Sequence, residues 1–348
     1  MVEAVMTDGA ARQALADELS QFNVRIAQQG DRPLFTTSPQ PSMVPLQWRA
    51  PDIARLLEKI GHQVKLESGG QRRTLRLTNP GLDYGTTPTF WCSIQYILPG
   101  EIASCHRHSP TALRFIMSGA GARTTVDGER YEMNEGDLVL TPSMTWHDHE
   151  HLGDAPMVWL DVLDISLVRA LDATFFEGSA QDLQPLAAEP QRGALQYGSG
   201  LMQPFRHAHV APSTPVPVYE WGHAIQVLQS AEALTPDPYF DTAFEYQNPL
   251  NGGPALSTIG TALQRLRPGM QGRPHRNTGS TVLYVVRGNG TLQTETDMFE
   301  WSAGDFMAIP SWCLHHISNR SSSDDAVLFH VNDRPALSKL GLYREEFI

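Results

Sequence analysis

The sequence predicts a fold dominated by β-structure, with two copies of one β-sandwich or β-barrel domain behind an N-terminal helical segment. Three observations support this class. The 348 residues include 28 Gly and 25 Pro, which favour frequent turns. From about residue 74 the chain runs in short stretches rich in β-branched and aromatic residues, such as FWCSIQYIL and ALRFIMSG. A set of glycines, prolines and histidines from the first half recurs in the second half.

Two helices are expected before the first β-run. Apolar residues at helical spacing predict the first helix over residues 10–29, namely Ala14, Leu15, Leu19, Phe22 and Ile26. The second helix is expected over residues 51–60, because Pro51 suits a first helical turn and Gly61 suits a C-terminal stop. Both helices are interpreted as packing elements without a chemical role.

The repeat predicts an internal duplication. Gly100, His106, Gly119, Gly136, Pro142 and His147 are matched by Gly269, His275, Gly288, Gly304, Pro310 and His315, at offsets of 168 or 169 residues. Matches at so constant an offset exceed what chance would give, so each copy is expected to form one β-domain. The expected division is an N-terminal helical segment covering the barrels (1–73), a first barrel (74–165), a helical and irregular connector (166–255), and a second barrel with a C-terminal tail (256–348).

Composition excludes several classes of function. The chain carries 26 Lys+Arg against 38 Asp+Glu and a net charge of -12, which argues against a nucleic-acid binder that follows a phosphate backbone. No apolar run approaches the roughly 18 residues that a membrane span needs, and the first residues lack the apolar stretch of a signal peptide. Three cysteines make a disulfide framework improbable on number alone. A cytoplasmic protein is expected.

Three histidines form a metal-ligand pattern in the first half. His106 and His108 lie on the same face of a strand, and His147 follows roughly 40 residues later. Such a set can hold a divalent metal on one side and leave its other side open for substrate and oxygen, as non-haem iron chemistry requires; the spacing alone would also suit Mn, Zn or Ni. If the strand continues unbroken, Arg114 shares this inward face, and its planar fork suits a carboxylate.

These residues resemble the two sequence motifs of the cupin superfamily. The first motif, G-x5-H-x-H-x3-E-x6-G, matches Gly100, His106, His108 and Gly119, and the second, G-x5-P-x-G-x2-H-x3-N, matches Gly136, Pro142 and His147. Ala112 stands at the Glu position, so three neutral ligands remain. The stretches CHRHSPTALRFIMSG, RRTLRLTNPGL and TPSMTWHDHEH narrow the resemblance to the bicupin ring-cleaving dioxygenases of the gentisate 1,2-dioxygenase family, over residues 30–345.

The resemblance implies two double-stranded β-helix (jelly-roll) barrels, one Fe(II) per chain in the N-terminal barrel, and a homotetramer. It implies an oxidoreductase that incorporates both atoms of O2 into gentisate, cleaves the ring between the carboxyl-bearing and hydroxyl-bearing carbons, and gives maleylpyruvate. Salicylate, substituted salicylates and 1-hydroxy-2-naphthoate stay open as substrates. A bicupin hydrolase or decarboxylase and a non-catalytic binding or storage protein stay open as other functions.

The resemblance also implies which side chains surround the substrate. Arg114 would bind the carboxylate, Gln95 would donate or accept a hydrogen bond, and Trp91 with the Arg72 and Arg73 pair would form the pocket wall and the N-terminal segment over it. Ordinary core packing is the competing interpretation for Trp91, and a solvent-facing position at the barrel rim is the competing one for Arg114.

Two further residues resemble a pair that hydrogen-bonds the substrate's oxygens and carries protons, His149 and Asp161. His149 has the parity of His147, and Asp161 lies in the apolar run VWLDVLD, where a buried carboxylate needs a partner. Asp164 competes with Asp161 for this role, and His151 is interpreted as a loop residue.

The second copy of the motif is degenerate. It keeps His275 and His315 but has Asn277 in place of His108, and Thr281 stands at the Glu position. Two imidazoles and a neutral amide make a poor Fe(II) site. The second barrel is therefore expected to be structural, without tightly held iron, and to serve packing and oligomer assembly.

Overall fold

The computed structural model describes residues 9–25, 35–64, 72–189, 191–202, 204–205 and 214–348. The chain forms two compact units, residues 1–40 and 41–348. The first unit contains helix α1 (Gly9–Ser20), which ends well before the expected residue 29. Asn23 adopts a left-handed backbone with φ of 54°, which breaks a helix, while residues 26–29 lie outside the described ranges.

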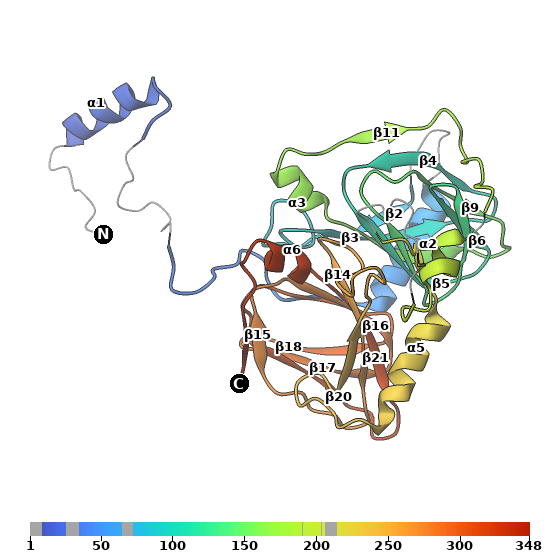
Figure 1. The fold of residues 1–348 in the computed structure, drawn as a ribbon. Coiled ribbons are helices and arrows are strands. Elements are labelled where there is room, and N and C mark those ends of the chain that lie inside the picture. Colours follow the sequence, from blue (N-terminus) through green and yellow to red (C-terminus); the bar gives the residue numbers. More distant parts are fainter. Residues whose placement is uncertain (1–8, 26–34, 65–71, 190, 203, 206–213) are drawn as a thin grey trace. The chain divides into compact units, whose positions relative to one another are not determined.

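The second unit contains two β-barrels, each built from two antiparallel sheets, so the predicted fold class is confirmed (Figure 1). In the first barrel one sheet has the order β12 (Val218–Tyr219), β8 (Leu138–Thr141), β5 (Ala112–Ser118), β10 (Met157–Leu163), β3 (Trp91–Ile97), β2 (Thr74–Arg76). Its other sheet has the order β11 (Phe176–Gly178), β4 (Ile102–His108), β9 (His147–His151), β6 (Ala122–Val126), β7 (Glu129–Met133).

The second barrel repeats this topology. One sheet has the order β1 (Leu46–Trp48), β19 (Phe306–Ile309), β16 (Thr281–Arg287), β21 (Ala326–Asn332), β14 (Gly260–Leu266), β13 (Thr242–Glu245). The other has the order β18 (Met298–Ser302), β17 (Asn289–Thr294), β20 (His315–Asn319), β15 (His275–Asn277), β22 (Glu345–Phe347). Four short strands thus extend the barrel sheets from outside the predicted barrels: β1 from the N-terminal segment, and β11, β12 and β13 from the connector. Only helical and irregular structure was expected in these two regions.

Short helices link the strands: α2 (Ala50–Gln63), α3 (Ile165–Ala170), α4 (Arg192–Tyr197), α5 (Trp221–Ser230), the 3-10 turn η1 (Ala231–Ala233) and α6 (Arg334–Lys339). Helix α2 confirms the expected helix at residues 51–60, but Gly61 does not end it. A Cβ at Gly61 would lie 2.7 Å from the ring of Tyr96, so this glycine permits a close approach between helix and strand. Within the described residues, no helix has the length and apolar character that crossing a membrane requires.

The two barrels exchange edge strands. Strand β1, which precedes the first barrel, pairs with β19 of the second barrel, and β12, which precedes the second barrel, pairs with β8 of the first. Equivalent buried carboxylates hold the helices that follow: Asp305 accepts from the N–H of Ala50 at 2.7 Å, and Asp137 accepts from the N–H of Trp221 at 2.8 Å. The duplication therefore ties each barrel to the other.

Side-chain alternation on β5 separates the barrel interface from the barrel interior. Leu113 and Phe115 belong to the large core that both barrels share, where the ring of Phe115 stacks on Phe329 with 4.1 Å between centroids. Ile116 belongs instead to a core inside the first barrel, together with Trp159. Arg114 shares the parity of Ile116 and is 0 % exposed, so its side chain is enclosed inside the barrel.

The expectation of one unbroken strand from His106 to Arg114 is wrong. Strand β4 ends at His108, and β5 begins at Ala112 in the opposite sheet. Pro110 lies between them; it has no N–H to donate and restricts the residue before it. Arg114 is nevertheless directed inward, because β5 places its side chain in the interior from the other sheet.

Candidate metal centre

Three imidazoles meet inside the first barrel. His106 and His108 come from β4 and His147 from the neighbouring β9, where His106 and His147 are directly paired across the two strands. One ligand nitrogen from each ring lies within 4.8 Å of the others. The ring centroids are 4.2 Å apart for His106 and His147, 4.8 Å for His108 and His147, and 5.5 Å for His106 and His108.

Backbone carbonyls orient all three rings in the same way. Nδ1 of His106 lies 2.7 Å from the carbonyl oxygen of Ser104, Nδ1 of His108 lies 2.7 Å from that of Pro110, and Nδ1 of His147 lies 3.0 Å from that of Thr145. A carbonyl can only accept, so each Nδ1 carries the proton in the neutral ring. Each Nε2 then carries the lone pair that a metal ligand needs.

The electrostatics keep these rings neutral. Burial, together with the nearby guanidinium of Arg72, lowers the pKa of His106 to about 3. Burial lowers the pKa of His108 as well, and it lowers that of His147 well below the ordinary value. Nε2 of His147 is buried and has no hydrogen-bond partner in the described ranges, which is costly unless a ligand binds to it. The donor set therefore fits a divalent metal.

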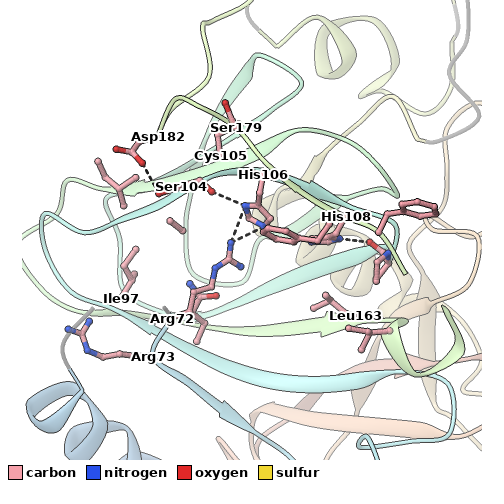
Figure 2. Close-up of a pocket in the computed structure, with 18 of the residues that line it drawn as sticks. Arg72, Arg73, Ile97, Ser104, Cys105, His106, His108, Leu163, Ser179 and Asp182 are labelled. Carbon is pink, nitrogen blue, oxygen red and sulfur yellow. Dashed lines mark hydrogen bonds between the residues drawn. The ribbon is translucent and has the colours of Figure 1, made fainter. Parts of the chain in front are cut away.

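A cavity of about 480 Å³ opens beside this group (Figure 2). Its walls include His106, His108, Arg72, Gln95, Leu163 and Phe176. Arg114, His147, His149 and Asp161 are not among the described lining residues, and each is at most 6 % exposed. The cavity thus reaches two of the three imidazoles and has room for a small aromatic acid.

Arg114 and Asp161 form a buried charge pair on paired strands. Nε of Arg114 lies 3.6 Å from Oδ1 of Asp161, and Nη1 donates to Oγ1 of Thr141 at 3.1 Å. Nε and Nη2 of Arg114 have no hydrogen-bond partner among the described residues. The rim interpretation for Arg114 is therefore wrong, and the guanidinium keeps unused donors for an anion.

The two arginines of the predicted N-terminal wall differ in their partners. Nη2 of Arg72 lies 3.0 Å from Nε2 of His106, where a bound metal would compete for the same lone pair. Burial lowers the pKa of Arg72 to about 10, so it stays charged near neutral pH. Nη1 of Arg73 donates to Glu101 Oε1 at 2.6 Å, and its Nε donates to the carbonyl of Val64, so its charge is already paired.

Gln95 lines the cavity, whereas Trp91 does not. Gln95 is 3 % exposed and its Oε1 lacks a hydrogen-bond partner, so an amide oxygen is available at the wall. Trp91 packs edge-on against Tyr84 at 4.4 Å between centroids, and the guanidinium of Arg76 lies 4.9 Å from its ring centroid. This placement favours ordinary packing for Trp91.

His149 lies deeper in the barrel than the cavity wall. It is 0 % exposed, and its ring centroid is 6.1 Å from that of His147. Within the part of the chain that the structure describes, neither of its nitrogens has a hydrogen-bond partner. Burial lowers its pKa well below the ordinary value. His151 is a strand residue and not a loop residue: it ends β9, and its Nε2 bonds the carbonyl of Ala155 at 2.7 Å.

The second barrel keeps two histidines at the equivalent positions but differs in the third side chain. His275 and His315 have ring centroids 4.4 Å apart, and Nδ1 of His315 lies 2.8 Å from the carbonyl of Cys313. Asn277 and His330 line the same cavity, which has a volume of about 410 Å³. Within the described part of this barrel, no third His, Cys, Asp or Glu joins the two imidazoles to form a triad.

Phe176 was not predicted as a site residue, and its ring stacks on that of His106 with 5.4 Å between centroids. It lies on β11, a three-residue strand paired with β4, which is too short for a periodic signal. The pair of aromatic residues in FFEG is the one local feature that could have drawn attention to it.

Comparison with known proteins agrees with this architecture. The family model described as a cupin domain matches residues 93–163 and 262–332. A gentisate 1,2-dioxygenase from Streptomyces sp is 36 % identical, over 97 % of this chain and 98 % of that protein. A 1-hydroxy-2-naphthoate 1,2-dioxygenase from Nocardioides sp. (strain KP7) is 34 % identical, over 97 % and 90 %. The crystal structure of a salicylate 1,2-dioxygenase from Pseudoaminobacter salicylatoxidans with gentisate has a TM-score of 0.90 and 30 % identity, over 99 % of this chain and 95 % of that one.

Proposed function

This chain belongs to the gentisate 1,2-dioxygenase family of bicupin ring-cleaving dioxygenases, and we propose that it uses O2 to cleave gentisate to maleylpyruvate. The observation that carries the proposal is the convergence of three neutral, buried imidazoles beside a fully buried arginine with unused donors. Full-length similarity to several gentisate 1,2-dioxygenases supports the same substrate.

We infer that His106, His108 and His147 hold one Fe(II) per chain through their Nε2 atoms. Three neutral ligands leave the ion's positive charge uncompensated, which favours an ortho-hydroxy carboxylate. When bound, iron supplies a redox-active centre at which such an acid and O2 can react. The protein's share is to hold the ligands in one tautomer, to exclude water and to place charge.

Arg114 would bind the substrate's carboxylate. Its Nε and Nη2 lack hydrogen-bond partners inside the barrel, and their donation to a carboxylate would be charge-assisted. Asp161, whose Oδ1 lies 3.6 Å from Nε of Arg114, offsets part of the guanidinium charge. Arg72 adds a second positive charge near His106, while Gln95 offers an amide oxygen to a ring hydroxyl.

His149 would accept a hydrogen bond from a hydroxyl of the substrate. Burial lowers the pKa of its ring, so the ring is neutral and carries a lone pair that can accept that hydrogen bond. Asp161 is the other group of the expected pair. No hydrogen bond between His149 and Asp161 occurs among the described residues, and Oδ1 of Asp161 instead lies 3.6 Å from Nε of Arg114.

Salicylates and 1-hydroxy-2-naphthoate are the second candidate substrates. A 5-aminosalicylate 1,2-dioxygenase from Comamonas sp is 34 % identical over 96 % of this chain and 89 % of that protein. Gentisate differs from salicylate by a 5-hydroxyl that activates the ring. A non-catalytic binding protein is disfavoured, because such a role requires neither the complete histidine triad nor the buried arginine.

The experiment is a turnover screen. The purified chain is loaded with Fe(II) without oxygen, and oxygen uptake is then measured with gentisate, salicylate and 1-hydroxy-2-naphthoate. The proposal expects about one Fe per chain and fastest uptake with gentisate. Bound iron with no uptake on any of these acids would contradict it. We also propose that the protein is cytoplasmic and that it forms a homotetramer. Size-exclusion chromatography with light scattering would test the tetramer, and cell fractionation would test the location.

A further inference from the structure

The peptide bond between Pro110 and Thr111 connects a histidine of the triad to a buried carboxylate. Its carbonyl oxygen accepts from Nδ1 of His108 at 2.7 Å. Its N–H donates to Oδ1 of Asp164 at 2.7 Å. The other oxygen of Asp164, Oδ2, accepts from the hydroxyl of Thr258 at 2.6 Å. One continuous chain of hydrogen bonds therefore runs from His108 to Thr258.

This chain of bonds crosses from one barrel to the other. Thr258 lies just before β14 of the second barrel, whereas His108, Thr111 and Asp164 belong to the first. Thr111 is 6 % exposed and Asp164 is 4 % exposed, so water is largely excluded. In such surroundings hydrogen bonds polarise one another, and a peptide whose N–H is bound to a carboxylate has a carbonyl that accepts more strongly.

The duplication repeats the arrangement in the opposite direction. Oδ1 of Asp333 accepts from the N–H of Ser280 at 2.8 Å, and Oδ2 accepts from the hydroxyl of Thr89 in the first barrel at 2.7 Å. There Asn277 takes the place of His108, and its Oδ1 accepts from the N–H of Gly279 at 2.8 Å. The second chain of hydrogen bonds also contains an aspartate carboxylate and a threonine hydroxyl, but it does not end at an imidazole.

We propose that Asp164, held by Thr258 of the second barrel, is a positioning residue that fixes His108 and strengthens its bond to the metal through the Pro110–Thr111 peptide. The inference rests on the proposed function, because it presumes a metal at the triad. Outer partners that fix the tautomer and orientation of a ligating histidine typically change metal affinity about 10- to 100-fold. The second barrel thus contributes to the chemistry of the first.

The mirrored chain of bonds supplies matched controls for the test. Asp164→Asn and Thr258→Val weaken the chain that ends at His108, and Asp333→Asn and Thr89→Val make the same changes in the chain that ends at Asn277. The metal-free full-length protein is titrated with Co2+ under anaerobic conditions, and binding is followed by the visible absorption of the bound ion. The melting temperature of each metal-free variant is measured alongside.

Asp164→Asn should weaken Co2+ binding about 10-fold, and Thr258→Val should weaken it by a smaller factor, roughly 2- to 5-fold. The two controls should bind Co2+ as the wild type does, although they too lose stability. Unchanged affinity in both first-chain variants, or an equal loss in all four variants, would overturn the inference. Should Asp164→Asn not fold, Thr258→Val decides alone. Wild-type protein that binds no Co2+ would contradict the proposed function itself.

Discussion

The two barrels share one frame and differ in the side chains that it presents. Glycines with left-handed backbones stand at equivalent turns, as in Gly119 and Gly288 with φ of 98° and 94°. Inside the barrels, the residues His108, Arg114, His149 and Asp161 correspond to Asn277, Leu283, Ile317 and His330. The first set completes a group of three imidazoles that could hold a metal and adds a buried guanidinium, and the second set does neither.

The residues that close each barrel are therefore different from the residues that could bind a metal or a substrate. The glycine turns, the shared apolar core and the reciprocal carboxylate contacts occur in both halves, so both barrels close. Only a few interior positions decide whether a closed barrel can hold metal. Exchanging those positions between barrels should move the chemistry while leaving the fold intact.

The largest expected effect comes from removing equivalent histidines. His106→Ala should abolish metal binding and turnover, exceeding the roughly 100-fold loss typical of an outer partner, because a direct ligand is lost. His275→Ala should leave turnover within about twofold, since no triad forms around it among the described residues. Metal content per chain and oxygen uptake measure both variants. Full activity in His106→Ala would remove this residue from the ligand set.

The second-largest effect is expected from Arg114→Leu. This variant carries the residue type found at the equivalent position of the second barrel, Leu283. Loss of charge-assisted hydrogen bonds worth about 1.5–3 kcal/mol should raise KM for gentisate about 10- to 100-fold. Arg114→Lys, which keeps the charge without the planar fork, should show an intermediate KM. Initial-rate kinetics and melting curves separate binding from folding. An unchanged KM in Arg114→Leu would place the carboxylate elsewhere.

Asn277→His attempts the reverse exchange in the second barrel. The rings of His275 and His315 are 4.4 Å apart, close to the 4.2 Å between His106 and His147, so a third imidazole would complete a triad. Metal content should rise from about one to about two ions per chain, with little change in turnover because Leu283 cannot bind a carboxylate. Asn277→Ala is the control and should keep one ion. If Asn277→His still binds only one metal ion per chain, other differences in the second barrel must prevent metal binding there.

The smallest effect concerns pH and the second barrel's carboxylate. Burial raises the pKa of Asp333 to about 6. The folded chain then holds this proton more tightly than the unfolded chain, so the group's stabilising contribution is full below pH 4 or so and is lost as pH rises to about 6. In Asp333→Asn the free energy of unfolding, relative to wild type, should therefore rise by about 2 kcal/mol between about pH 4.5 and about pH 6.5. Denaturant melts at both pH values measure it, and a difference that does not change with pH would contradict the raised pKa.

Local patterns in the sequence predicted the repeat and the triad. Alternation within His106 and His108 depends only on strand geometry, and the glycines of the repeat reflect backbone angles that other residues rarely adopt. Strands β1 and β12 were not predictable, because two or three residues carry no periodicity and their partners lie in the other barrel. The same holds for Asp164 and Thr258, which chain folding alone brings together.

The most direct test of the central claim is anomalous diffraction at the iron edge from crystals of the anaerobically loaded protein. We expect one strong peak per chain, next to Nε2 of His106, His108 and His147, and no comparable peak between His275 and His315. An absent peak in the first barrel, or a stronger one in the second, would contradict it.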